Sequence, residues 1–226
     1  MCGRFTLTST DDLVDDLELA MAPPALTPRF NVAPTQRVAV VTNRVERELE
    51  LFRWGLVPRW AKDLKIGARM INARSETVAE KPAFRSAYKH RRCLVLGDGF
   101  YEWKREGKAR LAHYIHRADK RGFAMAGLWE QWRDADGEAI HSCTILTTAA
   151  NDLIATIHHR MPVMISPEDY GRWLHPEPLP PDMLQDLLVS APAETFHMYP
   201  VTSRVGRVSN DDARCLEPAP VQAQLF

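Results

Sequence analysis

Five segments that are apolar or alternate between apolar and polar residues follow one another between residues 92 and 148, and they constrain the fold more than any other feature. They cover residues 92–98, 100–104, 111–117, 123–132 and 139–148, and turns that contain Gly or Asp, such as residues 134–137, separate them. Short runs joined by short turns are typical of antiparallel strands, because parallel strands need long crossovers. We therefore expect a largely antiparallel sheet.

The flanking sequence adds a hairpin and short helices to this sheet. Residues 36–42 and 48–54 predict the hairpin, and Ser166, as a helix cap before Pro167 at the first helical position, predicts a helix start. Further helices are expected from Thr10 onward and within 75–90, 151–157 and 182–189, and a last strand near 196–202. The prediction is an α+β fold, a single domain over residues 1–226 of twisted, barrel-like sheet with a few short peripheral helices and an irregular tail from about residue 213.

Positive charge is concentrated in one part of a chain whose net charge is zero. Residues 53–92 contain eleven Lys or Arg and three Asp or Glu, a local charge of +8, and they include Trp54 and Trp60. Cations with interleaved aromatic rings suit single-stranded nucleic acid, since phosphates meet cations and bases stack on rings. The alternative is an ordinary solvated surface.

The four cysteines are widely spaced and form no CxxC pair, which argues against a disulfide framework and against a zinc site. Cys93 and Cys143 lie in apolar strand-like runs and are expected to pack in the core. The sequence has no apolar run long enough to span a membrane and no signal peptide pattern. We expect a cytoplasmic protein without a membrane segment, metal or other cofactor.

Cys2 follows Met1 directly, so removal of Met1 would place an α-amine and a thiol on adjacent carbons. The amine titrates at about pH 7.7–8.0 and is partly nucleophilic at neutral pH. With an aldehyde, the amine can form a Schiff base and the thiol can then close a five-membered thiazolidine. The alternative is that cysteine stands at this position by chance.

Six short motifs occur in order along the chain. They are residues 2–5 (Cys-Gly-Arg-Phe), 31–34 (Asn-Val-Ala-Pro), the Trp-Gly turn at 54–58, 72–77 (Asn-Ala-Arg-Ser-Glu-Thr), 99–103 (Gly-Phe-Tyr-Glu-Trp) and 158–162 (His-His-Arg-Met-Pro). Together they resemble the SOS response-associated peptidase family, and the resemblance covers residues 2–212. It implies an abasic-site sensor of the DNA damage response that crosslinks covalently to abasic sites in single-stranded DNA.

The resemblance implies a role for four residues in this crosslinking. Cys2 would be the nucleophile, and Asn72 would hold Cys2 and the sugar by hydrogen bonds. Glu102 lies between two aromatic side chains, and a partly dehydrated carboxylate suits proton transfer. His158, selected over His159 by its spacing from residues 160–162, would assist opening of the sugar ring. Taken alone, an Asn before a helix or a His after one is more often a cap.

The DNA contacts follow from the resemblance and from the basic segment. Arg4, Arg74 and Arg160 would hold phosphates that flank the lesion, Trp54 and Trp60 would stack on bases, and Arg85 is expected in the same groove. The expected protein is a monomer of the bacterial nucleoid whose partner is abasic single-stranded DNA.

Two other classes of protein stay open. A thiol peptidase with Cys2 as an N-terminal nucleophile would act on peptides, and self-removal of Met1 would be a related step; an aminopeptidase could also remove Met1. A non-catalytic nucleic-acid binding module would bind DNA without a covalent product. Within the abasic-site reading, a lyase side activity is open too, because a Schiff base at C1′ acidifies the C2′ protons.

Overall fold

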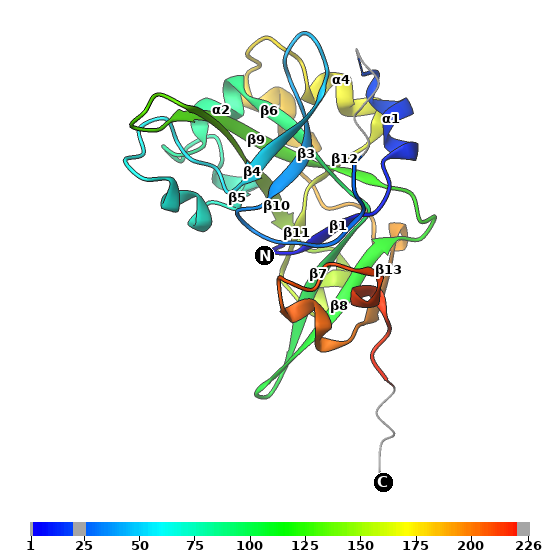
Figure 1. Ribbon diagram of the computed structural model, residues 1–226. Helices are drawn as coiled ribbons and strands as arrows, with labels where there is room; N and C mark the ends of the chain where they lie inside the picture. Colours follow the sequence, from blue (N-terminus) through cyan, green and yellow to red (C-terminus); the bar gives the residue numbers. More distant parts are fainter. Residues whose placement is uncertain (1, 20–25, 221–226) are drawn as a thin grey trace.

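The computed structural model describes residues 2–19 and 26–220 of the chain (Figure 1). Five strands form a closed barrel in the order β10-β4-β3-β6-β9, and pairing between β9 and β10 closes it. These strands are β3 (Arg37–Thr42), β4 (Leu49–Trp54), β6 (Arg92–Gly97), β9 (Phe123–Arg133) and β10 (Ala139–Ala149). All neighbours are antiparallel except β4 and β10, which run parallel over two residue pairs.

Three short strands extend the barrel sheet. β11 (Arg160–Pro162) pairs with β10, and β12 (Met164–Ile165) pairs with β9, both in antiparallel orientation. β5 (Asn72–Arg74) runs parallel to β10, with Asn72 opposite Ile145. β10 therefore has β5 and β11 beside the end at which it leaves the barrel.

A second sheet of five strands lies beside the barrel, in the order β13-β8-β7-β1-β2. Its strands are β1 (Phe5–Leu7), β2 (Arg29–Val32), β7 (Gly99–Glu106), β8 (Ala109–Arg117) and β13 (Phe196–Pro200). Figure 1 shows β1 crossing between the barrel and β7, while the hairpin of β7 and β8 extends away from the barrel. The first residues of the chain therefore lie where the two sheets meet.

The helices are short and peripheral, as expected from the sequence. They are α1 (Asp11–Leu17), α2 (Arg85–His90), α3 (Asp152–Ala155) and α4 (Tyr170–Trp173), with 3₁₀ turns at Leu64–Arg69, Ser75–Thr77, Pro167–Asp169, Pro181–Leu187, Ala193–Thr195, Ser203–Gly206 and Ala213–Leu216. α1 buries Leu13 and Leu17 and carries Asp11 and Asp12 in its first turn, where the helix dipole favours acids.

Three local predictions need correction. Ser166 does not cap the following turn, because its hydroxyl donates to the Asp169 side chain (3.2 Å) rather than binding a backbone amide. The segment 182–189 is a 3₁₀ turn over Pro181–Leu187. The tail is not irregular from residue 213, since Ala213–Leu216 form a turn capped by Asp212; residues 221–226 lie outside the described part. The α+β class with a largely antiparallel, barrel-like sheet is confirmed.

The barrel interior is apolar, and β6 is buried along its whole length. Cys93 and Cys143 are both fully buried, which confirms their predicted place in the core. Arg92 is also fully buried although it belongs to the basic segment. Its guanidinium donates to five backbone carbonyls, those of Tyr88, Lys89, Trp173, His175 and Glu177, at 2.6–3.3 Å. This arginine therefore fastens the end of α2 and residues 173–177 to the barrel.

Replacement of this buried guanidinium should destabilise the protein strongly. Arg92→Met keeps much of the side-chain volume but leaves buried carbonyls without donors, so we expect a loss of about 3 kcal/mol in the free energy of unfolding. The measurement is urea unfolding followed by tryptophan fluorescence. Lys89→Met, which removes an exposed neighbouring cation, should change stability by less than about 0.5 kcal/mol. Equal effects of the two variants would contradict the anchoring role of Arg92.

Candidate functional site at the amino-terminal strand

Cys2 lies just before β1 and is completely buried, within the apolar cluster that also contains Phe5 and Trp54. Its Sγ is 3.9 Å from the carbonyl oxygen of Arg4, to which it donates. Burial, and next the negative charge of Glu102, raise the pKa of the Cys2 thiol well above its usual range. The thiol is therefore protonated at neutral pH. Met1, whose removal the sequence analysis expects, lies outside the described residues.

Asn72 binds the backbone of Cys2. It stands at the start of β5, and its Nδ2 donates to the Cys2 carbonyl oxygen at 2.9 Å. Among the described residues, the buried Oδ1 of the same side chain has no hydrogen-bond partner. Asn72 therefore offers an unused acceptor beside the residue that it holds.

The Trp-Gly turn supports Asn72 by binding the two residues that precede it in the chain. The indole of Trp54 donates to the carbonyl oxygen of Ile71 at 2.8 Å, and the Leu56 amide donates to that of Met70 at 3.1 Å. Gly55 has φ +125° and lies against Gly67, whose carbonyl oxygen would be only 2.5 Å from a Cβ at position 55. No other residue fits this turn without displacing the chain that leads into β5.

Trp54 presents no ring face to solvent, since its exposed fraction is 0%. Its ring packs edge-on against Phe5 with centroids 5.1 Å apart. We therefore assign Trp54 to the support of β1 and β5 rather than to base stacking. Trp60 is 61% exposed and keeps the proposed stacking role.

Glu102 and His158 face each other next to Cys2. Glu102 lies on β7 and is almost completely buried, and its Oε1 is 3.8 Å from Nδ1 of His158, close enough for an ion pair when the imidazole is protonated. The ring of His159 stacks on that of His158 with centroids 4.6 Å apart, but His159 is exposed. The structure thus brings His158, and not its neighbour, to the carboxylate.

One hollow adjoins the first residues of the chain, and a second lies beside Asn72, which binds Cys2. The first hollow, of about 950 Å³, is lined by Gly3, Arg4, Glu102 and His158 together with residues 103–105 and Arg110 of the β7–β8 hairpin. The second hollow, of about 600 Å³, is lined by residues of the basic segment, among them Trp60, Asn72, Arg74, Lys81 and Phe84. Glu102 and His158 therefore line one open surface and Asn72 lines the other.

The predicted phosphate-binding arginines differ in availability. Arg160 is buried, and its guanidinium binds both carboxylate oxygens of Glu76 (2.5 and 2.9 Å) and the Thr147 carbonyl oxygen (2.5 Å). These hydrogen bonds lower the pKa of the Glu76 carboxyl. We therefore assign Arg160 to the support of β11 and β10. Arg74 and Arg85 are exposed, and Arg4 is half-buried at the wall of the first hollow.

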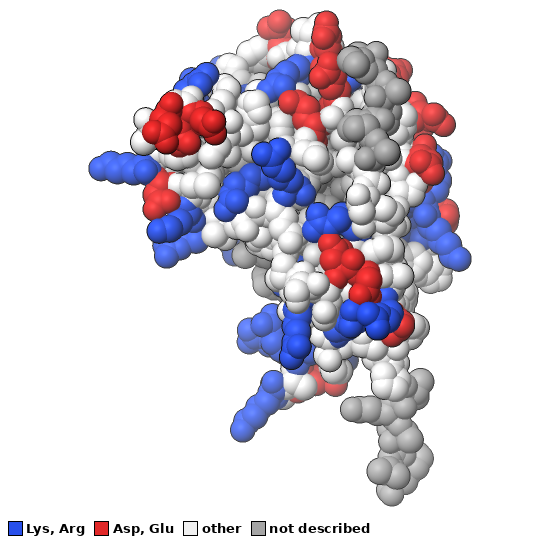
Figure 2. Space-filling view, in the orientation of Figure 1, with Lys and Arg blue, Asp and Glu red and all other residues white. Residues whose placement is uncertain are grey.

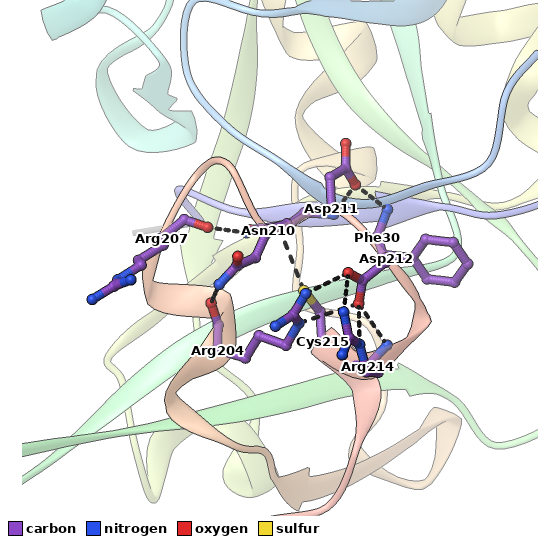
Figure 3. A network of polar contacts seen from close by, with 9 residues as sticks. Phe30, Arg204, Arg207, Asn210, Asp211, Asp212, Arg214 and Cys215 are labelled. Carbon is purple, nitrogen blue, oxygen red and sulfur yellow. Dashed lines mark hydrogen bonds and ion pairs between the residues drawn. The ribbon is translucent and has the colours of Figure 1, made fainter.

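A clamp that the sequence analysis missed holds the amino-terminal strands, and we define it as residues 203–216. The amide of Asn31 donates to the carbonyl oxygens of Val205, Arg207 and Asn210 at 2.7–3.2 Å, and its Oδ1 accepts from Arg4 at 2.9 Å. Figure 3 shows Asp211 accepting from the Phe30 amide (2.6 Å), with Asp212 bound to Arg204 and Arg214 in the same segment. The motif at residues 31–34 was the only sequence signal for this clamp.

Neither a metal-binding cluster nor a membrane-spanning helix occurs in the described ranges. Residues 2–19 and 26–220 contain no group of three or more His, Cys, Asp or Glu that could hold a metal ion. In the same ranges no helix is both long and apolar enough to cross a membrane.

The fold and the site define a class of protein with a small barrel, a second sheet and an N-terminal strand at their junction. The cysteine before this strand lies beside an amide and a carboxylate, and the carboxylate faces an imidazole. The chain belongs to the SOS response associated peptidase (SRAP) family, whose sequence profile matches residues 1–208. The family that the six motifs predict is thereby confirmed.

Relatives resemble the chain over nearly its whole length. The abasic site processing protein YoaM of Bacillus subtilis is 42% identical and covers 96% of this chain and 98% of its own. The abasic site processing protein YedK of Escherichia coli is 32% identical and covers 96% of this chain and 100% of its own. A crystal structure of a Bacteroides thetaiotaomicron protein superposes with a TM-score of 0.86 at 26% identity, covering 96% of this chain and 100% of its own.

Proposed function

We propose that this protein processes abasic sites in single-stranded DNA by binding them covalently through Cys2. The observation that carries the proposal is the convergence of Cys2, Asn72, Glu102 and His158 from distant parts of the chain. Two of the relatives described above are named abasic site processing proteins, which gives the substrate class. A bacterial nucleoid protein acting as a monomer is part of the same proposal.

The chemistry begins at the amine of Cys2, once Met1 has been removed. The ring-opened abasic sugar carries an aldehyde at C1′, and the amine nitrogen attacks this carbon to give a carbinolamine. Loss of water forms the imine. The thiol sulfur then bonds to the same carbon while its proton passes to the imine nitrogen, which completes the thiazolidine. No oxidant or reductant is needed.

The raised pKa of the Cys2 thiol fits this order of steps. A buried, protonated thiol is a poor first nucleophile, so the amine reacts first and the sulfur follows once a strongly electrophilic imine stands beside it. Glu102 is the proposed acid–base group, since it can take a proton from the amine and return it to the departing hydroxyl. His158 is proposed to assist opening of the sugar ring, and the Oδ1 of Asn72, which no described residue binds, is the proposed partner of a sugar hydroxyl.

Binding of the strand is assigned to side chains around the two hollows, of which Arg74, Arg85 and Trp60 are exposed and Arg4 is half-buried. Arg74 and Trp60 line the second hollow, Arg85 begins α2 nearby, and Arg4 lines the first. Because phosphate contacts release counterions, this surface should make binding strongly dependent on salt. A lyase outcome, by elimination from the imine, belongs to the same proposal.

The first test is a denaturing gel of mature protein incubated with single-stranded DNA that carries one abasic site. Wild type should give a heat-stable adduct, and Cys2→Ala should lose it but keep an imine that borohydride traps, because the amine remains. Cys215→Ala, which removes another buried thiol, should crosslink like wild type. Equal heat-stable adduct from Cys2→Ala would rule out the thiazolidine. Turnover of peptides without any adduct would favour the thiol peptidase.

The second test addresses proton transfer. Glu102→Gln should slow crosslinking about 10²–10⁴-fold at nearly unchanged DNA affinity, the usual value of general acid–base help. His158→Ala should slow it less when an already opened aldehyde is supplied. The measurement is the single-turnover rate as a function of pH. A wild-type rate for Glu102→Gln across about pH 5–9 would show that the carboxylate has no acid–base role.

The third test addresses the binding surface of the second hollow. Replacement of Arg74 and Arg85 by Gln should lower the slope of log affinity against log salt by about 0.7 for each phosphate that the variant no longer binds. The yield of crosslink at saturating DNA should not change. An unaltered slope in the double variant would place the binding groove elsewhere.

A further inference from the structure

The hairpin of β7 and β8 carries a second group of cations, outside the basic segment of residues 53–92. We call residues 103–112 the arm. It contains Lys104, Arg105, Lys108 and Arg110 and a single acid, Glu106. Residues 105–111 are all exposed, and Figure 1 shows the hairpin extending away from the barrel.

Two arginines of the arm face each other at a cost to stability. Arg105 and Arg110 are direct partners in the antiparallel register, so their side chains leave the same face of the hairpin about 5 Å apart at Cβ. Like charges in this position destabilise a strand pair. The one acid nearby does not relieve them, because Glu106 is paired with Lys104 at 2.8 Å. Among the described residues, neither arginine side chain has a hydrogen bond or an ion pair.

The arm shares a wall with the proposed reaction site. Lys104, Arg105 and Arg110 line the first hollow together with Glu102 and His158. The Cα atoms of Glu102 and Arg105 lie about 10 Å apart on β7 at 3.3 Å per residue, and the two side chains leave opposite faces of the strand. This distance is within reach of nucleotides that neighbour a lesion held at Cys2.

The arm and the basic segment lie on different sides of this site. Asn72 and Arg74 line the second hollow, whereas the arm lines the first, and Figure 1 shows β1 between β5 and the hairpin of β7 and β8. Figure 2 shows Lys and Arg side chains on the hairpin and again on the upper part of the molecule, with uncharged surface and a group of acidic side chains in between. A strand that crosses the site therefore meets one group of cations on each flank.

We propose that the arm is a second nucleic-acid binding surface, in which Arg105 and Arg110 together hold backbone phosphates on only one flank of the abasic site. A phosphate between the two guanidinium groups converts their repulsion into two charge-assisted contacts. The inference rests on the proposed function, since it takes the abasic strand as the ligand of the first hollow.

The experiment measures equilibrium binding of dye-labelled single strands by fluorescence anisotropy over a range of salt concentrations. Each strand contains a stable tetrahydrofuran analogue of the abasic site, which cannot form an imine. One strand extends only to the 5′ side of the analogue and the other only to the 3′ side. Replacement of Arg105 and Arg110 by Gln should lower the slope of log affinity against log salt (the salt slope) by about 1.4, which is about 0.7 for each of two phosphate contacts. We expect this decrease with one of the two strands and not with the other.

Matched variants separate charge position from total charge. Arg105→Lys with Arg110→Lys should keep the wild-type slope, and Lys120→Asn, which removes an exposed cation beyond the other end of β8, should leave it unchanged. The Gln variant should unfold at the same or a higher urea concentration than wild type, because a like-charge pair has been removed. A lower midpoint would show that the pair is structural and would overturn the proposal.

Three further results would overturn it as well: an unchanged salt slope with both strands, an equal decrease with both, or a decrease matched by Lys120→Asn. Reactive abasic DNA at saturating concentration distinguishes this inference from the proposed function. The Gln variant should then give the same heat-stable adduct as wild type. If the wild-type protein forms no adduct, the proposed function is contradicted. The role of the arm would then still be decided by the one-sided effect on the salt slope.

Discussion

The carboxamide of Asn31 holds together the parts of the chain on which the site depends. Fully buried at the end of β2, it reaches three backbone carbonyls of the clamp and accepts from Arg4. Arg4 also donates to the Val205 carbonyl oxygen at 2.8 Å, so β1 and the clamp are joined twice. Loss of this amide would leave several buried polar groups unsatisfied at once. The place of Cys2 relative to Glu102 and Asn72 thus depends on an interaction with the other end of the chain.

Arginines serve two separate purposes in this protein. Arg92 and Arg160 are buried, and their guanidinium groups donate to backbone carbonyls or to a carboxylate. These acceptors replace the water that a guanidinium loses on burial. Arg74, Arg85, Arg105 and Arg110 are exposed around the two hollows. Charge counting along the sequence cannot separate these groups. The +8 of residues 53–92 therefore overstates the charge that a DNA strand would meet, and the arm adds to it from outside that segment.

Periodicity was enough to predict the local parts of the fold. The spacing of apolar residues displays three parts of the fold directly in the sequence. These are the five segments between residues 92 and 148, the hairpin before them and α1. Closure of the barrel could not be predicted, because it depends on a parallel pairing of β4 with β10, in which Arg53 lies opposite Ser142. Burial of Trp54 and the clamp on Asn31 are likewise long-range. The convergence of Asn72, Glu102 and His158 on Cys2 was anticipated only through motifs shared with a family, since each residue alone is more often a cap or a strand position.

The clamp also has a consequence for the synthesis of the protein. A ribosome makes Cys2 long before residues 203–216, yet β1 and β2 are fastened through Asn31 to that later segment. Until the clamp leaves the exit tunnel, Asn31 and Arg4 lack these hydrogen bonds, and the amino-terminal residues can be held only by earlier parts of the chain such as β7 and Asn72. Emergence of the clamp, and not the appearance of the cysteine, therefore sets the moment at which the amino-terminal strands are fully fastened.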